Sequence, residues 1–230
     1  MKIFHIIVST FQPVYLACND IRRKQCAQYG VPYLICFNGK KPADYVLRED
    51  ERLLEEEGMN PYMFLKFKYA LQEIFSKGYT PDYIIRTTST LFINYKKLPW
   101  VLSYLPKERS CAGPWMHKDN DKVFCNGTCM ILSQDVARRL AFDDNAAHPL
   151  VLNENDDVSI SLLARDYAQL YDTNYFYWWL PNKKTTFEQS ELIPMQQYVF
   201  LRINNEITRD VDVVLWDYFY RLFDVAGYLN

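Results

Sequence analysis

The sequence lacks several patterns that identify common protein classes. It contains no C-x-x-C pair, and its three histidines are scattered along the chain, which argues against a structural zinc site. No block of lysine and arginine stands out and the formal net charge is −2, so neither a nucleic acid nor an anionic membrane is expected as a partner. No apolar run reaches the length of a membrane helix, so no membrane span is expected.

The N-terminus also lacks a convincing signal peptide. Its apolar run, residues 3–8, is short and contains His5, and the polar Gln12 and Pro13 soon follow. The run is better explained as a first buried strand. We therefore expect a soluble, cytoplasmic protein, bacterial or viral in origin or a domain of a longer chain, with reduced and mostly buried thiols. These thiols are Cys18, Cys26, Cys36, Cys111, Cys125 and Cys129.

The composition fits one domain with a sizeable core. The 230 residues contain no repeat and no linker that would force a boundary, so residues 1–230 are expected to form a single domain. Aromatic residues make up 16% of the chain, including 18 Tyr and 14 Phe. Such a chain offers aromatic walls to a ligand, although an aromatic-rich core explains the composition nearly as well.

Alternating strand and helix patterns indicate an α/β fold with a largely parallel sheet in the first half. Residues 48–57 are acidic and read as a solvated helix face or loop, and 181–194 as a mobile loop. Strands are predicted at 3–8, 31–37, 83–85, 91–93, 111–115, 124–132 with a break at 126–128, 175–180 and 198–203. Helices are predicted at 14–29, 62–77, 99–105, 136–142, 158–165 and 210–229.

One predicted strand ends in a polar patch. Residues 83–85 form a β-branched and aromatic run, and residues 86–90 read Arg-Thr-Thr-Ser-Thr. In open α/β sheets, ligands bind just outside the carboxyl ends of the strands, so this patch is a candidate site. The alternative is an ordinary connection between strands, whose hydroxyls cap the turn.

Two adjacent acids open a predicted helix. Asp156 and Asp157 precede the apolar positions of residues 158–165. Acids in a first turn complement the positive end of the helix dipole, which is explanation enough for an isolated pair. A carboxylate fixed in a cleft is also the group that takes a proton from an attacking hydroxyl, which makes one of these acids a candidate general base.

Four segments together resemble the GT-A glycosyltransferases, most closely the inverting galactosyltransferase and Fringe type, glycosyltransferase family 31. Residues 65–71 look like the family's leucine–lysine helix, with Lys68 at its lysine. Residues 83–98 look like the strand, acidic triplet, apolar run and asparagine of the family. Residues 124–135, which include Gly127, are similar to its glycine-containing segment, and residues 156–158 resemble its acidic pair and valine. The resemblance covers roughly residues 60–165.

The resemblance implies a GT-A mixed sheet flanked by helices, with residues 1–105 on the nucleotide-sugar side and 106–230 on the acceptor side. It implies a hexosyltransferase-like enzyme that moves a sugar from a nucleotide sugar, expected to be a uridine diphosphate sugar, to the hydroxyl of a glycan or other acceptor. The transfer is expected to invert the anomeric carbon, with Asp157 as general base.

The sequence departs from the family at the acidic triplet, which holds a divalent metal against the donor diphosphate. The triplet falls here on Thr88, Ser89 and Thr90. Hydroxyls alone are poor ligands for Mn²⁺ or Mg²⁺, because hard cations prefer charged oxygens. Either the enzyme works without metal, or a remote acid substitutes, or the fold has lost activity. We take the first as our hypothesis and expect no resident cofactor.

Without a metal, arginine and lysine would neutralise the leaving diphosphate. Singly, each of these cations is also explained by a surface salt bridge, and each tryptophan by core packing. Gly127 would let the backbone approach the sugar. The expected donor-binding residues are Ser9, Thr10, Lys68, Arg86, Thr87, Thr88, Ser89, Arg202 and Arg209. The expected sugar or acceptor contacts are Gly127, Asp156, Trp178 and Trp179.

Two other functions compete with this hypothesis. A non-catalytic carbohydrate- or nucleotide-binding module on a GT-A scaffold would explain the missing triplet, although such a module has no need of a base at Asp157. A nucleotidyltransferase would use a similar sheet, but the N-terminal part has no glycine-rich phosphate loop followed by lysine.

Overall fold

The computed structural model describes residues 1–55, 60–118, 122–180, 194–203 and 210–225. The strands are β1 (Ile3–Ser9), β2 (Tyr33–Asn38), β3 (Glu51–Leu54), β4 (Tyr83–Thr88), β5 (Leu91–Ile93), β6 (Ser110–Gly113), β7 (Trp115–Lys118), β8 (Lys122–Cys125), β9 (Cys129–Ser133), β10 (Gln169–Asp172), β11 (Tyr177–Leu180) and β12 (Phe200–Ile203). The helices are α1 (Pro13–Tyr29), α2 (Tyr62–Ser76), α3 (Leu98–Ser103), α4 (Gln134–Phe142), α5 (Pro149–Asn153), α6 (Asp156–Arg165), α8 (Asp210–Phe219), the 3₁₀ turn η2 (Asn174–Phe176) and the π-helical turn η3 (Tyr220–Val225).

A seven-stranded mixed sheet forms the centre of the molecule, in the order β10-β6-β9-β4-β1-β2-β3. Strand β1 lies parallel to β2 and β4, and β2 lies parallel to β3. Strand β9 runs antiparallel to both β4 and β6. The β-branched and aromatic residues of β1 and β4 are buried on both faces, as expected for central parallel strands covered by helices.

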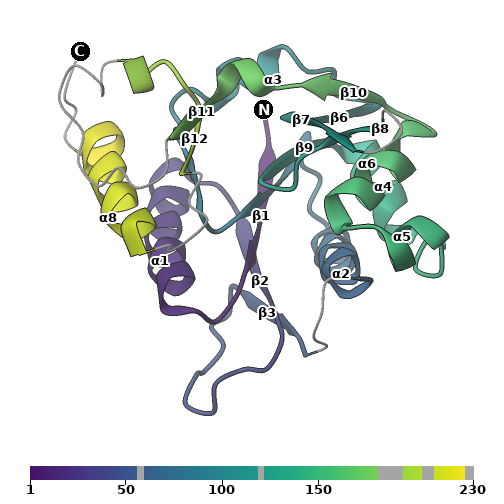
Figure 1. Cartoon of the computed structure of the whole chain (residues 1–230), viewed down its shortest axis with the longest axis horizontal. Helices are drawn as coiled ribbons and strands as arrows, with labels where there is room; N and C mark the ends of the chain where they lie inside the picture. The colour runs from purple at the N-terminus through teal and green to yellow at the C-terminus, as the bar shows by residue number, and fades with distance from the viewer. Residues whose placement is uncertain (56–59, 119–121, 181–193, 204–209, 226–230) are drawn as a thin grey trace.

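Helices cover both faces of this sheet. Figure 1 shows α1 and α8 on one side of β1 and β2, and α2, α4, α5 and α6 on the other. Alternate residues of the strands supply the two cores: Ile6 and Ile84 pack with α2 and α4, whereas Ile7 packs with Ile35 and Phe37. A second sheet, β11-β12-β5, packs against α8 through Phe92 and Leu201.

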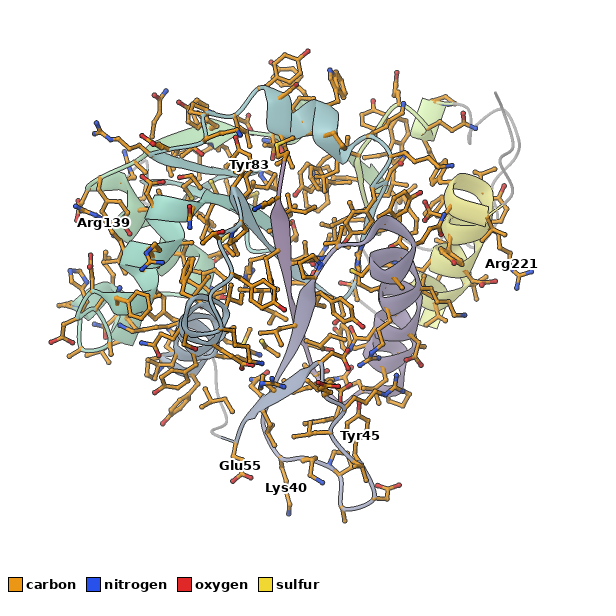
Figure 2. The ribbon with its side chains drawn as sticks, turned by 180° about the vertical axis from the view of Figure 1, so that it is seen from behind. Lys40, Tyr45, Glu55, Tyr83, Arg139 and Arg221 are labelled. Atoms are coloured by element: carbon orange, nitrogen blue, oxygen red, sulfur yellow. The ribbon has the colours of Figure 1, made fainter. Side chains whose placement is uncertain are left out.

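The amino and carboxyl ends of the parallel strands lie at opposite ends of the molecule. In Figure 2, Lys40, Tyr45 and Glu55 lie at the lower end of the molecule, where they follow the carboxyl ends of β2 and β3. Tyr83, which begins β4, lies nearer the upper end. Of the candidate residues, Ser9, Thr10 and Thr88 lie at the carboxyl ends of β1 and β4.

The predicted elements are largely confirmed, and the interruption at 126–128 separates β8 from β9. The prediction for residues 48–57 is wrong in part, because Glu51–Leu54 forms strand β3. Glu51 is 2% exposed and forms an ion pair with Arg23 of α1, so its charge is compensated inside the fold rather than by water. Strand β10 and helix α5 were not predicted. The predicted loop 181–194 lies outside the described residues except for Pro194.

The cysteines and the possibility of a membrane span were both considered from the sequence. All six cysteines are buried and none of them is in a disulfide, as predicted. Of the helices that the structure describes, none combines the length and the apolar character needed to cross a bilayer.

Candidate functional site at the carboxyl ends of the strands

Arg86 of β4 and Asp156 of α6 form a buried ion pair at the centre of the candidate site. Arg86 is 2% exposed and Asp156 is 7% exposed. One guanidinium nitrogen, Nη2, donates to Asp156 Oδ2, and the other, Nη1, donates to the backbone carbonyl of Gly127. Arg86 thus ties together β4, the β8–β9 connection and the start of α6. These contacts give it an internal partner in place of the phosphate expected from the sequence.

Asp157, the next residue, is held by the backbone. The Gly127 N–H donates to Asp157 Oδ2 at 3.0 Å, and the Val158 N–H donates to Asp157 Oδ1 at 2.9 Å. Burial, and then the negative charge of Asp156, raise the pKa of the Asp157 carboxyl above its ordinary value. The Asp157 carboxylate is therefore half-buried and fixed in orientation, and its pKa is raised. A fixed orientation and a raised pKa are two properties of a general base.

Gly127 is small because side chains occupy the space beside it. A Cβ at this position would lie 2.7 Å from Arg86 Nη1 and 3.1 Å from Asp157 Cβ. Both distances are shorter than ordinary van der Waals contacts. The groups that approach Gly127 closely are therefore the Arg86 guanidinium and the Asp157 side chain, at the place where a sugar was expected from the sequence.

Thr88 ends β4 and meets an arginine from the second sheet. Arg202 of β12 donates through Nη1 to Thr88 Oγ1 at 2.9 Å, and the Thr88 N–H donates to the Thr128 carbonyl at 3.2 Å. Thr88 and Arg202 are both half-buried. The first position of the expected triplet thus lies beside a cation supplied by the protein itself.

The other two triplet positions point into the protein. Ser89 is 1% exposed and donates to the Val8 carbonyl through both its N–H, at 3.0 Å, and its hydroxyl, at 3.2 Å. Thr90 is 2% exposed. Of the two acids nearby, Asp156 is neutralised by Arg86. Within the described ranges, no group of three or more His, Cys, Asp or Glu is placed to hold a metal ion. This donor set does not fit the divalent metal that the resemblance implies.

Ser9 and Thr10 lie at the end of β1, as expected. Ser9 is buried, and its hydroxyl accepts from Asn19 Nδ2 at 2.8 Å and lies 3.3 Å from the Thr10 carbonyl. Thr10 is half-buried at the same edge of the sheet. Of the two, Thr10 is therefore the residue more open to a ligand.

Thr87 faces away from this cluster. Its hydroxyl lies 2.7 Å from His5 Nε2, and His5 Nδ1 lies 2.6 Å from the hydroxyl of Tyr95. Burial lowers the pKa of His5 well below its ordinary value, so the ring is neutral. The network buttresses β4 from behind, and its members are fully or almost fully buried.

The two neighbouring tryptophans of β11 lie on opposite faces. Trp178 packs against Tyr198 with ring centroids 4.8 Å apart, in the core cluster that includes α8. Trp179 is 40% exposed and pairs with Arg202 in the parallel register of β11 and β12, so the two side chains share a face. The structure therefore brings Trp179, but not Trp178, to the side of Arg202.

The lysine singled out by the sequence lies elsewhere. The Lys68 ammonium donates to the Asp143 carbonyl at 2.6 Å and to Asn145 Oδ1 at 2.9 Å, and so fastens α2 to the connection between α4 and α5. A second lysine on the same helix, Lys66, reaches the end of β2 instead, where it donates to Asn38 Oδ1. Lys66 was not among the residues predicted from the sequence to bind a ligand. Arg209 lies outside the described residues.

A cavity of about 700 Å³ lies at the opposite end of the parallel strands. Its walls include Ile3 at the start of β1, Pro32 before β2, Pro81 before β4, and Leu98 of α3. None of the residues discussed above as donor or acceptor contacts lines it. The candidate site and this cavity are therefore separate features.

Comparisons with known proteins bear on the fold. No protein-family model matches the sequence, and no curated protein matches it. The structure is similar to a glycosyltransferase involved in the glycosylation of the major capsid of PBCV-1, with a TM-score of 0.54 and 8% identity over 94% of this chain and 100% of that chain. It is also similar to the galactosyltransferase LgtC, solved with donor and acceptor sugar analogues, with a TM-score of 0.51 and 9% identity over 99% of this chain and 97% of that chain. The chain therefore has a mixed α/β fold of the GT-A glycosyltransferase type, as the resemblance implied.

Proposed function

We propose that this protein transfers a sugar from a nucleoside diphosphate sugar to an acceptor hydroxyl, with Asp157 as the general base. The observation that carries the proposal is the placement of Asp157 in a fold of the GT-A type. Its carboxylate is oriented by two backbone N–H groups at the carboxyl ends of the strands, and burial raises its pKa. The hydrogen bond from Gly127, which lies outside α6, distinguishes Asp157 from an acid that only complements the dipole of its own helix.

The proposed reaction is a single displacement. Asp157 takes the proton of the acceptor hydroxyl as the acceptor oxygen forms a bond to the anomeric carbon of the donor. The bond from that carbon to the diphosphate oxygen breaks, and its electron pair leaves with the nucleoside diphosphate. Because attack and departure occur on opposite faces, the anomeric configuration inverts. The resemblance to the galactosyltransferase and Fringe type supports inversion and a hexose as the transferred sugar.

We assign the neutralisation of the leaving diphosphate to Arg202 rather than to a metal. Its guanidinium already lies against Thr88, at the first position of the expected metal-binding triplet. A guanidinium matches phosphate oxygens in charge and in bidentate geometry. Charge that develops on the leaving group would thus meet a cation already in position.

The nucleotide and sugar would extend from this point along the strand ends. Thr10 and Ser9 lie at the end of β1, directly beside β4 in the sheet. Trp179 is exposed on the Arg202 side and is the aromatic surface that we propose for stacking on a base or sugar ring. The acceptor would approach Asp157 from solvent, as a glycan or another molecule with a free hydroxyl.

A calorimetric panel tests the donor side of the proposal. The protein is titrated with uridine, guanosine, adenosine and cytidine diphosphates and their sugars, each with EDTA and with Mn²⁺. We expect one nucleotide to bind with the same affinity in both conditions. Binding that requires Mn²⁺ would contradict the metal-free assignment, and no binding in either condition would contradict the donor site.

The products test the chemistry. Incubation with the bound nucleotide sugar and a panel of free hexoses and glycans is followed by NMR of the anomeric proton. We expect a product whose anomeric configuration is opposite to that of the donor, and retention would contradict single displacement. A protein that binds the nucleotide sugar but transfers nothing across the panel would instead support the rival hypothesis of a binding module, which the hydroxyl triplet favours.

A further inference from the structure

Lys66 is a buried cation without a carboxylate partner in the described part of the chain. Its side chain lies on α2 and the residue is 3% exposed. The ammonium carries three donors, and one of them reaches an acceptor, Asn38 Oδ1, at 2.8 Å. Burying a charge without an opposite charge is costly, so an unpaired buried lysine needs an explanation.

Burial and a neighbouring cation both act against the charged form of Lys66. Burial lowers the pKa of its ammonium to about 8, and the positive charge of Arg86 acts in the same direction. The Asp156 carboxylate acts in the opposite direction but is already paired with Arg86. An additional anion next to Lys66 would favour the charged ammonium.

The register of the sheet places Lys66 at the candidate site. Val8 of β1 pairs with Cys36 on one side and with Thr88 on the other, and Asn38 lies two residues beyond Cys36 on the same face. Helix α2 flanks β1 and β2 on this face (Figure 1). The Lys66 ammonium therefore lies at the carboxyl end of β2, and β1 separates that strand from β4, which ends at Thr88.

Lys68 supplies the contrast that makes Lys66 unusual. Both lysines lie on α2, and Lys68 is 8% exposed. The Lys68 ammonium has two oxygen acceptors, the Asp143 carbonyl and Asn145 Oδ1, which explain it as a structural tie. Lys66 has a single amide oxygen, Asn38 Oδ1, and the NH₂ group of the same amide is a further donor.

We propose that Lys66 and Asn38 form a subsite for an anionic oxygen group of the donor, either a phosphoryl oxygen of the nucleotide or the carboxylate of an acidic sugar. This inference rests on the proposed function, since it assumes that the donor binds at the carboxyl ends of the strands. The ammonium supplies charge-assisted hydrogen bonds, and the amide supplies a neutral one. A bound anion would keep Lys66 protonated at mildly alkaline pH, where the free protein loses that proton.

The first test observes the amine directly in the unaltered protein. NMR of ¹³C-lysine-labelled protein follows each lysine through a pH titration, alone and with millimolar inorganic pyrophosphate or D-glucuronate, and the K66M variant assigns the resonance. We expect the pKa of Lys66 to rise from about 8 with at least one of the two anions. Lys68 should not respond. A Lys66 resonance that ignores both anions would overturn the proposal.

The second test compares K66M with K68M by calorimetry. A hydrogen bond between charged groups contributes about 1.5–3 kcal/mol, which corresponds to about a tenfold to a hundredfold change in affinity. We expect K66M to weaken the binding of pyrophosphate, of D-glucuronate or of both by that factor, and K68M to leave the affinity for both anions unchanged. If K66M loses affinity for pyrophosphate, the subsite binds a phosphoryl oxygen of the nucleotide. If it loses affinity for D-glucuronate alone, the subsite binds the carboxylate of an acidic sugar. Equal affinities of K66M and the unaltered protein for both would overturn the subsite.

The two proposals fail separately. Anion binding at Lys66 in a protein that transfers no sugar would retain the subsite and contradict the enzymatic function. Sugar transfer by a protein whose Lys66 responds to neither anion would support the enzymatic function and contradict the subsite.

Discussion

At the amino ends of β1 and β4, a cavity of about 700 Å³ opens among Ile3, Pro81 and Leu98, whereas the carboxyl ends of the same sheet carry Arg86, Asp157 and their partners. The cavity offers volume, and the carboxyl ends offer charged groups that are oriented and partly desolvated. Reaction chemistry depends on such groups more than on volume. The comparison between the two ends therefore favours the carboxyl ends as the location of the proposed site.

The largest effect should come from Asp157→Asn. An amide cannot take the proton of the acceptor, so we expect the transfer rate to fall by about 10²–10⁴-fold with the fold retained, as measured by product formation. Asp135→Asn is the matched control, because Asp135 is also an acid in the first turn of a helix and its carboxylate accepts from the Arg109 N–H. If both variants retain transfer, Asp157 only complements the helix dipole.

The buried ion pair should have the next largest effect, on stability. Arg86→Met leaves Asp156 buried without its partner, and breaking such a pair costs about 3–5 kcal/mol of unfolding free energy. Urea denaturation measures the loss, and the double variant R86M/D156L should recover much of it. A loss below about 1 kcal/mol would mean that the pair is solvated, in the range typical of exposed pairs.

Arg202→Gln should reduce transfer by about tenfold to a hundredfold, the effect of losing one charge-assisted contact to the leaving group. The expected change is in both donor affinity and rate, measured by calorimetry and by initial rates with EDTA present. Arg221→Gln is the control, because its guanidinium is exposed and pairs with Asp217 on the same helical segment. Equal rates for both variants would separate Arg202 from the donor.

The pH dependence should show a smaller but diagnostic shift. Transfer requires the ionised form of Asp157, whose pKa is raised by burial and by Asp156. Activity should therefore fall as the pH drops through that raised pKa. Asp156→Asn removes the second cause, so the acidic limb of the profile should move to lower pH. An unchanged limb would assign it to another group.

The smallest effect should come from the opposite end of the strands. Tyr79 lines the cavity there and packs edge-on against Phe4 with ring centroids 5.1 Å apart. Tyr79→Ala should cost about 0.5–1.5 kcal/mol for the lost aromatic pair and leave the transfer rate unchanged. A large loss of transfer in this variant would break the comparison between the two ends.

Much of the fold could be predicted because its signals are local. The apolar run of β1, the apolar run of β4 with its polar end, and the acids that open α6 are each formed by residues that are close together in the sequence. Strand β3 could not be predicted in this way. Its Glu51 looks solvated in the sequence, and only the distant Arg23 explains its burial.

The candidate site was predicted as a set of residues but not as a set of contacts. Arg86 and Asp156 are 70 residues apart, and Thr88 and Arg202 are 114 apart, so no spacing rule pairs them. Likewise, Lys66 and Lys68 look equivalent in the sequence of α2. Only the structure distinguishes them, because the connection between α4 and α5 supplies two acceptors to Lys68, whereas Lys66 has Asn38 Oδ1.

The sequence by itself determined the alternation of strands and helices, the polar ends of the strands and the presence of an acidic pair at a helix start, because periodicity and capping act over a few residues. The tertiary structure decided which cations are paired with a carboxylate, as Arg86 is with Asp156, and which are held by neutral groups, as Lys66 is by Asn38. That outcome depends on which strands and helices become neighbours, and on how much water their packing removes from each charge.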